Sequence, residues 1–586
     1  MTSATQSQTG TSVDPVTLEV IRHAFLAAAD EMKLNLMRTA YNPIIYEVLD
    51  FSVGVFDARC RTVAQADGLP IFLGNLGIAV QCVVDDIGVD NLRPGDLYLF
   101  NDPYAQGNHV NDLTTIVPVF DAEGPIAFAS TRAHWLDIGG KDPGGSIDST
   151  DVVQEGLWFR SIPLYREGVL NDAVWRIIEY NVRYTKNMLG DLRAQVAASR
   201  TGEQRLAGIF ARHGRAVTEA AIEEINRQGE QRVRAAIGAM PDGIYEAESA
   251  LDDDCIGNGP LPVKVRAIVD GDELTIDLEG SAGQNPGVVN CGFPATLSAC
   301  RIALKSITNP GLPACEGDFA PMTVRVPEDS MFNARYPAPT FMYGTHLILL
   351  IDTVCRALAQ AIPGRVLAGH YGNLSGFMLV GHDPASGELY IQQEPENGGW
   401  GASESQDGEN AMIFVADGDT RNIAAEVLES RFPLRLERHE LRTDSGGPGR
   451  NRGGLGILRE YRILGHTAHL TAIMDRKVCP PWGLDGGGPA WHCKTVVDPG
   501  TADEHVWQKA MRVPVADGSL VSVQTGGGGG WGDPLQRPPE RVIDDVIAGY
   551  VSREAAERDY RVVLDGALAL DLEATTSLRA AQSGGR

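Results

Sequence analysis

The segment spanning residues 101–140 constrains the fold most strongly, because it carries two His-x-x-Asp motifs beside short strand-like runs. The first motif joins His109 to Asp112, and the second, 25 residues later, joins His134 to Asp137. Two imidazoles and a carboxylate suit borderline and hard divalent metals. A fold that brings the motifs together would form a metal centre with open coordination positions, as an enzyme requires. The spacing alone leaves both aspartates open as ligands.

Length, charge and cysteine usage narrow the class of protein. A chain of 586 residues exceeds what one hydrophobic core usually serves, so two to four lobes are expected. A net charge of −27 repels phosphate backbones and anionic lipids, which argues against nucleic-acid and membrane partners. The nine cysteines include no C-x-x-C pair, and the N-terminus lacks an apolar signal segment. We therefore expect a cytoplasmic protein with reduced thiols.

The pattern of apolar residues predicts a mixed α/β (α+β), multi-lobed fold, with a strand-rich metal-binding N-terminal lobe, a helical middle segment and a Gly-rich β C-terminal region. Its expected parts are a disordered tail at 1–13, an N-terminal α/β lobe with the metal site at 14–170, a helical segment at 171–240, a β-rich α/β lobe with Gly-rich loops at 241–535, C-terminal helices at 536–573 and a flexible tail at 574–586.

Within the first lobe, Asp14 and Pro15 are typical of a helix start, and apolar residues at helical spacing predict a helix over 15–38. From residue 50 to about 165 the sequence pattern changes to short apolar runs separated by turns that contain Gly, Pro and Asp. FSVGVFD, DLYLF, TTIVPVF and IAFAST are the predicted strands. Both His-x-x-Asp motifs fall at strand ends or in loops, which excludes a helical HExxH zinc site.

Several acids near these strands are candidates for acid–base catalysis. Glu47, Asp50 and Asp57 flank the first predicted strand, although a surface turn is the favoured interpretation for each of them taken singly. A metal-bound histidine also needs an acceptor for its second ring nitrogen. The residues close enough in sequence to serve there are Asp102, Asn108, Asn111 and Asp137.

The glycine clusters give no phosphate-binding loop. Gly139-Gly140-Lys141 is followed by Asp142 rather than Ser or Thr, so no Walker A motif is present. The run Gly526–Gly530 suits either an anion-binding nest or close backbone packing, and packing is the favoured interpretation. No G-x-S-x-G elbow occurs, and no cysteine pairs with a motif histidine, so covalent acyl transfer has no support.

Several longer stretches point to a family. They include VDPVTLEVIRHAF, VAQADGLPIFLGNLG, NDPYAQGNHVNDLTTIVPVF, GDLRAQVAASR, DGIYEAESALDDD, SGGPGRNRGGLG and GGGGGWGDP. Over nearly its whole length the chain resembles the hydantoinase B / oxoprolinase family, the metal-bearing subunits of ATP-dependent hydantoinases, oxoprolinases, lactamases and acetone- or acetophenone-type carboxylases.

The resemblance implies a division of labour. A hydantoinase A-type partner binds ATP and Mg and phosphorylates the substrate, which then reaches the subunit that resembles this chain, in a hetero-oligomer expected to be α2β2. The residues that match the family's ligands to a divalent metal (Mn, Zn or Fe) are His109, Asp112 and His134. Asp137 is then left either to orient a metal ligand or to transfer protons, and Asp102 and Glu47 are further candidates for proton transfer.

The function implied is hydrolysis of a cyclic amide, such as a hydantoin, 5-oxoproline or another lactam. A carboxylase of the acetone or acetophenone kind, which would use bicarbonate, is the first alternative, and a non-catalytic scaffold subunit is the second. The chain departs from the family pattern twice, with PIFLG at 70–74 where PxHLG is frequent and NIAAE at 422–426 in an NTPVE-like element. Both departures fall where substrate selection is expected, so the resemblance leaves the substrate open.

Overall fold

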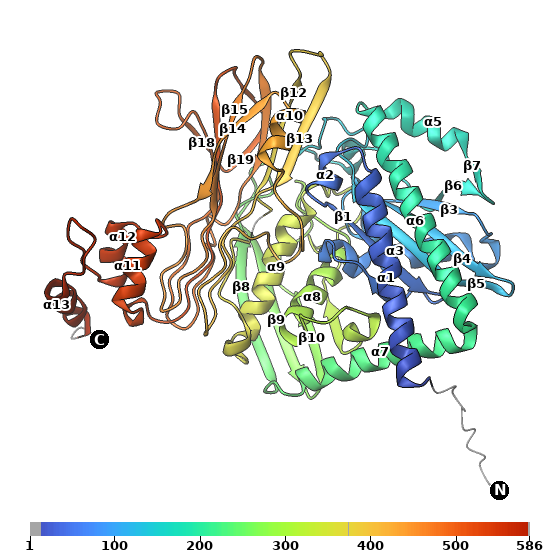
Figure 1. Cartoon of the computed structure of the whole chain (residues 1–586), viewed down its shortest axis with the longest axis horizontal. Coiled ribbons are helices and arrows are strands. Elements are labelled where there is room, and N and C mark those ends of the chain that lie inside the picture. The colour runs from blue at the N-terminus through green and yellow to red at the C-terminus, as the bar shows by residue number, and fades with distance from the viewer. Residues whose placement is uncertain (1–12, 373, 584–586) are drawn as a thin grey trace, which may run out of the picture.

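The computed structural model describes residues 13–372 and 374–583, so the tail predicted over 1–13 lies almost entirely outside the described residues. The described chain has a mixed α/β architecture built around four mainly antiparallel sheets (Figure 1), which confirms the predicted fold class.

The N-terminal sheet has seven strands in the order β2-β1-β5-β4-β3-β6-β7. The long β4–β5 hairpin lies at its centre, and β1 pairs with β5 in antiparallel register from Phe51 opposite Ala133 to Asp57 opposite Ala127. The strands are β1 (Phe51–Asp57), β2 (Thr62–Gln65), β3 (Leu97–Phe100), β4 (Asp112–Asp121), β5 (Gly124–His134), β6 (Ile162–Arg166) and β7 (Val169–Leu170).

Helices cover both faces of this sheet because its strands are apolar on both sides. On one face lie α1 (Pro15–Thr39) and α6 (Thr185–His213), which approach so closely that a Cβ on Gly202 would overlap both Met32 and Ala129. On the opposite face of the sheet, Phe56 and Phe128 form a buried apolar cluster with residues of α3 (Pro70–Ile87).

Helix α3 is a correction to the sequence analysis, which predicted only short strands between residues 50 and 165. Its glycines and β-branched residues have low helix propensity, and burial on more than one side removes the amphipathic period. Among the described residues it is the one helix long and apolar enough to span a membrane by length and composition. Here α3 lies between the sheet and α8, and 44% of it is buried, as in a core helix.

The middle of the chain wraps around this lobe (Figure 1). Helices α5 (Asp172–Asn181), α6 and α7 (Arg215–Ile237) occupy the segment predicted to be helical. A four-stranded sheet in the order β11-β10-β9-β8 follows, with two buried helices beside it. These elements are β8 (Gly243–Leu251), β9 (Leu261–Asp270), β10 (Glu273–Asp277), α8 (Phe293–Thr308), β11 (Met322–Arg325) and α9 (Tyr343–Leu358).

The C-terminal half contains two further sheets, ordered β13-β12-β16-β19 and β14-β15-β20-β17-β18. They contact each other where Phe377 and Tyr461 stack, with ring centroids 4.7 Å apart. The strands are β12 (Gly376–His382), β13 (Leu389–Pro395), β14 (Leu434–Leu441), β15 (Ile457–Ile463), β16 (Ala468–Ile473), β17 (Lys494–Val497), β18 (His505–Trp507), β19 (Lys509–Val515) and β20 (Leu520–Gln524).

The glycine-rich segments lie side by side below these sheets, which bears out the packing interpretation. The amide of Gly447 donates to Gly528 O at 2.8 Å, and the amide of Gly528 donates to Gly454 O at 2.9 Å. In residues 445–456 and 525–534, a Cβ on any glycine except Gly532 would come closer than 3.0 Å to a neighbouring atom.

The chain ends in a small helical group at the edge of the molecule (Figure 1). Its helices are α11 (Pro539–Ile547), α12 (Arg553–Tyr560) and α13 (Leu572–Ser583). Helix α13 occupies much of the tail predicted to be flexible from residue 574. The amide of Ala574 donates to the carboxylate of Asp571, a capping bond that the sequence analysis overlooked.

Candidate metal centre

The β4–β5 hairpin brings the two motifs together. Asp112 is the first residue of β4, His134 is the last residue of β5, and the two are paired in register. His109 precedes β4 in a loop that starts at Gly107, which ends the short helix α4 (Pro103–Gln106). Gly107 has a φ of +94°, and a Cβ there would overlap the backbone of Ala295, so only glycine fits this turn.

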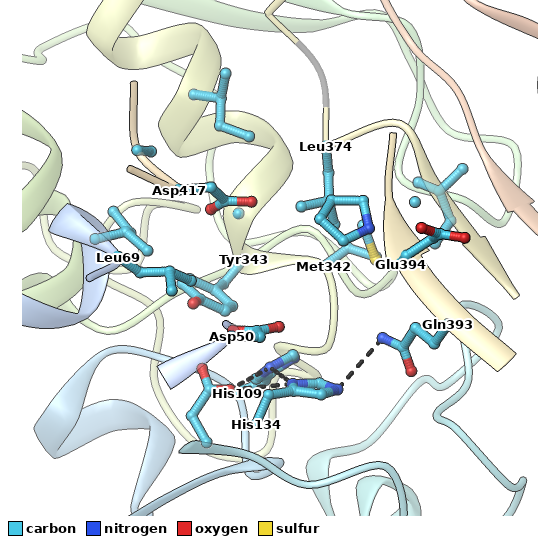
Figure 2. A pocket seen from close by; sticks show the side chains of 18 of the residues that line it. Asp50, Leu69, His109, His134, Met342, Tyr343, Leu374, Gln393, Glu394 and Asp417 are labelled. Atoms are coloured by element: carbon cyan, nitrogen blue, oxygen red, sulfur yellow. Dashed lines mark hydrogen bonds and ion pairs between the residues drawn. The ribbon is translucent and has the colours of Figure 1, made fainter. Parts of the chain in front are cut away.

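Three potential ligand atoms face one another at these positions, and Figure 2 shows the two imidazole rings next to each other. His109 Nε2 lies 2.8 Å from Asp112 Oδ1 and 3.1 Å from His134 Nδ1, and His134 Nδ1 lies 3.2 Å from Asp112 Oδ1. Ligands about 2.1 Å from one ion lie about 3.0–3.4 Å apart in octahedral or tetrahedral geometry. The three atoms are therefore spaced much as a bound divalent ion would space them, and the structure identifies these residues as a possible metal site.

Each imidazole has a neighbour on its other ring nitrogen. His109 Nδ1 lies 2.9 Å from Phe341 O, and donating to this carbonyl leaves a lone pair on Nε2. His134 Nε2 lies 3.3 Å from Gln393 Nε2, while Gln393 Oε1 is buried without a hydrogen-bond partner. Half a turn of the Gln393 amide puts Oε1 where His134 Nε2–H can donate, which leaves a lone pair on Nδ1.

Asp112 is held as an anion. Burial opposes its ionisation, but the two neighbouring histidines outweigh burial and hold the pKa of Asp112 well below its ordinary value. Its second oxygen, Oδ2, is buried without a hydrogen-bond partner. Because a buried carboxylate oxygen without a partner is costly, this orphaned atom fits a residue that shares its charge with a cation.

The three residues line a cavity of about 80 Å³, and Figure 2 shows His109 and His134 at one end of it. One water molecule needs at least about 10–15 Å³ of such space, so the cavity admits several waters or one small molecule. His109 is the most accessible of the three, with 8% of its surface exposed, against 2% for His134 and 0% for Asp112. The cavity also receives Asp50, Tyr343 and Gln393, together with Glu394 and Asp417.

Two further carboxyls face the cavity from separate parts of the chain (Figure 2). Asp50 precedes β1, and its carbonyl accepts from the amide of His134 at 3.1 Å, which places it beside the three ligands. Burial raises the pKa of Asp50 to about 7, despite the opposing effect of His134. Asp417 lies in the loop after β13, and burial, reinforced by Asp50 and Asp112, raises its pKa well above the ordinary value.

The residues predicted for proton transfer lie elsewhere. Asp137 accepts from the amides of Arg183 and Tyr184 and from the Arg183 guanidinium, so its carboxylate holds the start of α6. Asp102 caps α4 and pairs with Arg160 at 2.9 Å. Glu47 follows the short helix α2 (Pro43–Tyr46). None of the three lines the cavity among the residues that the structure describes.

The two departures from the family pattern fall in different surroundings. Phe72, from the PIFLG stretch, lines the cavity. Asn422, from the NIAAE stretch, donates to Glu396 at 2.9 Å and lies behind the cavity wall that Glu394 contributes to. Only the first departure therefore touches the space next to the candidate ligands.

Sequence reasoning named Asp50 but missed Asp417, Tyr343 and Gln393. All three missed residues lie in the second half of the chain, far from His109, and they reach the cavity only because the later elements pack against the N-terminal lobe. None of them lies in a motif with metal-ligand or catalytic spacing. The tertiary arrangement is the only signal that identifies them.

The raised pKa of Asp417 makes stability depend on pH. Because the folded protein holds this proton more tightly than the unfolded chain, the stabilisation is complete below the ordinary pKa of 3.8 and is lost as pH rises through the folded pKa. Asp417→Asn cannot titrate. We expect the melting temperature of the variant minus that of the wild type to increase as pH rises from about 5 to about 8.

This comparison is made on chelator-treated protein, because a bound cation would favour the ionised carboxylate. If the melting temperature of the variant minus that of the wild type stayed constant across this pH range, or fell with rising pH, the protonated state of Asp417 would be contradicted.

Comparison with known proteins identifies the family of the chain and agrees with its fold. The family model described as hydantoinase B/oxoprolinase matches residues 14–534. A Pseudomonas sp. (strain NS671) protein assigned as the B component of a D-/L-hydantoinase is 33% identical, over 97% of this chain and 98% of its own length. The beta chain of the Pseudomonas jessenii caprolactamase is 31% identical, over 97% of this chain and all of its own.

Solved structures show the same architecture. The crystal structure of ATP-dependent caprolactamase from Pseudomonas jessenii superimposes with a TM-score of 0.92 at 30% identity, and covers 97% of this chain and 100% of that one. Acetone carboxylase in its nucleotide-free form superimposes with a TM-score of 0.88 at 20% identity, over 98% of this chain and 83% of that one, which shows the fold alone. The chain belongs to the hydantoinase B/oxoprolinase family.

Proposed function

We propose that this chain is the metal-bearing, ring-opening subunit of an ATP-dependent cyclic-amide hydrolase. The observation that carries the proposal is the convergence of three ligand atoms from His109, Asp112 and His134 at the end of a small cavity. Relatives named as components of a hydantoinase and of a caprolactamase support the reaction class.

A partner subunit accounts for the ATP dependence. Both relatives carry names that mark them as one of several components of an enzyme. This chain has no phosphate-binding loop in its sequence. We assign ATP and Mg binding, and phosphorylation of the amide oxygen, to a hydantoinase A-type partner in an α2β2 assembly in the cytoplasm.

His109, Asp112 and His134 would hold a divalent ion, with Mn, Zn and Fe all suited to this donor set. When bound, the ion supplies a Lewis acid that polarises the activated carbonyl and lowers the pKa of water. The hydrogen bond from His109 Nδ1 to Phe341 O keeps the ring oriented, and the Gln393 amide does the same for His134.

Asp50 is our candidate for proton transfer. A carboxyl with a pKa of about 7 can accept a proton from water and return it to the ring nitrogen near neutral pH. Water adds to the activated carbon, the ring C–N bond breaks with protonation of nitrogen, and an acyl phosphate remains. A second water converts this acyl phosphate to carboxylate and phosphate.

The proposal is tested by co-expressing the chain with its ATPase partner and supplying lactams and hydantoins with ATP. We expect ring-opened product to form only when both subunits and ATP are present. Labelled bicarbonate distinguishes the alternatives: incorporation of label into product would replace this proposal with a carboxylase. A complex that turns over fully with Mg and ATP on the partner but with no metal bound to this chain would favour the scaffold alternative.

A further inference from the structure

The cavity beside the candidate ligands is walled mainly by hydrocarbon. Away from the three ligands, the side chains that line it include Ile44, Leu69, Phe72, Ile348, Leu374 and Phe377. Among the described residues that line it, none is a lysine or an arginine. The polar side chains that line it, apart from the candidate metal ligands, are Asp50, Tyr343, Gln393, Glu394 and Asp417, so a substrate in this space meets hydrocarbon and carboxyl groups but no cationic side chain.

Nearby cations are already engaged. Arg132 is fully buried behind the cavity and donates to Thr114 Oγ1 at 2.8 Å and to Phe72 O and Asn108 Oδ1 at 3.2 Å. Arg459 donates to the carboxylate of Glu394 at 2.9 Å. Neither guanidinium belongs to the cavity lining among the residues that the structure describes, so neither can pair with an anionic substituent there.

Glu394 does not add a free polar group to the wall. Its carboxylate accepts from Arg459, from the amide of Ile423 at 2.7 Å and from the hydroxyl of Tyr461 at 3.1 Å. Arg459 also pairs with Glu396 at 3.3 Å, so one guanidinium serves two carboxylates. An anionic substituent at this wall would therefore meet a carboxylate whose cationic partner is already shared.

From this lining we infer that the substrate is an uncharged cyclic amide whose ring and substituent are hydrocarbon, and that amides bearing a carboxylate on the ring, such as 5-oxoproline, are rejected. This inference rests on the proposed function. The partner places the phosphoryl group on the reacting oxygen of the substrate. This group therefore lies at the end of the cavity where His109, Asp112 and His134 are. A ring carboxylate would lie at the hydrocarbon end, where burying an unpaired charge is costly.

A matched pair of substrates tests the inference. 5-Methylpyrrolidin-2-one and 5-oxoproline differ only in the methyl or carboxylate group at one ring carbon. In the complete two-subunit complex, we expect kcat/KM for ring opening to favour the methyl compound by about 100-fold or more. A preference below about threefold would overturn the inference. If neither compound were opened, the proposed function itself would fail.

A charged variant assigns the selectivity to this chain rather than to its partner. Leu374 is half-buried and points into the cavity (Figure 2), so a lysine there can keep its stem in the wall and offer its ammonium to the substrate. We expect Leu374→Lys to reduce the preference for the methyl compound at least about tenfold, whereas Leu374→Met keeps the preference because it adds no charge.

A wild-type preference that Leu374→Lys leaves unchanged would overturn the inference, because the selectivity would then lie in the partner. Phe72→His provides a second, independent cation-forming side chain in the same wall if the lysine variant does not fold. Metal content and circular dichroism establish that each variant is folded before its preference is scored.

Discussion

Replacing His109 or His134 by alanine is expected to abolish stoichiometric binding of divalent metal and to lower ring opening by the complex at least about 1000-fold. Each substitution removes one of three ligands, and the carboxylate of Asp112, which is fully buried, then keeps a single histidine partner. Metal is measured by mass spectrometry on the purified chain, and turnover is measured with the partner and ATP.

His469→Ala is the matched control, because His469 is an exposed histidine on β16 that does not line the cavity. It is expected to retain both metal and turnover. Fluorescence melting shows whether the ligand variants are folded. If His109→Ala and His134→Ala both retained metal and turnover, the assignment of the three ligands would be wrong.

The second large effect concerns the glycine-rich packing. A Cβ on Gly453 would overlap the carbonyl oxygen of Gly528, and both segments are held in place by backbone hydrogen bonds. No rotamer relieves a clash between a Cβ and backbone. We therefore expect Gly453→Ala to destabilise the chain by more than about 4 kcal/mol, seen as insoluble expression or a large fall in melting temperature.

Gly208→Ala is the matched control. Gly208 is exposed within α6, and a Cβ there would meet no atom within 4 Å. Alanine has the higher helix propensity, so this variant should be more stable by about 0.5–1 kcal/mol. If Gly453→Ala melted at the wild-type temperature, the close backbone packing of residues 445–456 against 525–534 would be incorrect.

Local patterns predicted the elements that carry the ligands. Three apolar runs, which end at Asp57, begin at Asp112 and end at His134, are bounded by turn residues. Each of them forms a strand of the N-terminal sheet. Helix α3 escaped prediction because burial on several sides erased its period. Propensity and periodicity report local structure well only where one face of an element meets solvent.

The second His-x-x-Asp motif shows what spacing cannot resolve. In sequence, Asp112 and Asp137 are equivalent, each three residues after a histidine. In the structure, Asp112 begins a strand and pairs across it with His134, whereas Asp137 follows the end of β5 and turns towards Arg183. Strand register, which depends on the whole hairpin, distinguishes a ligand candidate from a carboxylate that binds the segment before α6.

The other polar residues of the cavity could not be predicted from the sequence either, because no local pattern connects them. Tyr343 begins α9, Gln393 lies on β13 and Asp417 follows in a loop, and no shared motif links them. They converge because the C-terminal sheets pack against the N-terminal lobe. Contacts between elements so far apart in the chain depend on packing, and they leave no periodic trace in the sequence.

Chelation followed by reconstitution is the most direct measurement of the central claim. The chain is stripped of metal, recombined with untreated partner, and assayed for ATP-dependent opening of a neutral lactam before and after addition of Mn, Zn or Fe(II). We expect ring opening to be lost on stripping, and to return with one equivalent of metal per chain. Full ring opening by a complex that has Mg and ATP on the partner but no metal on this chain would contradict the account.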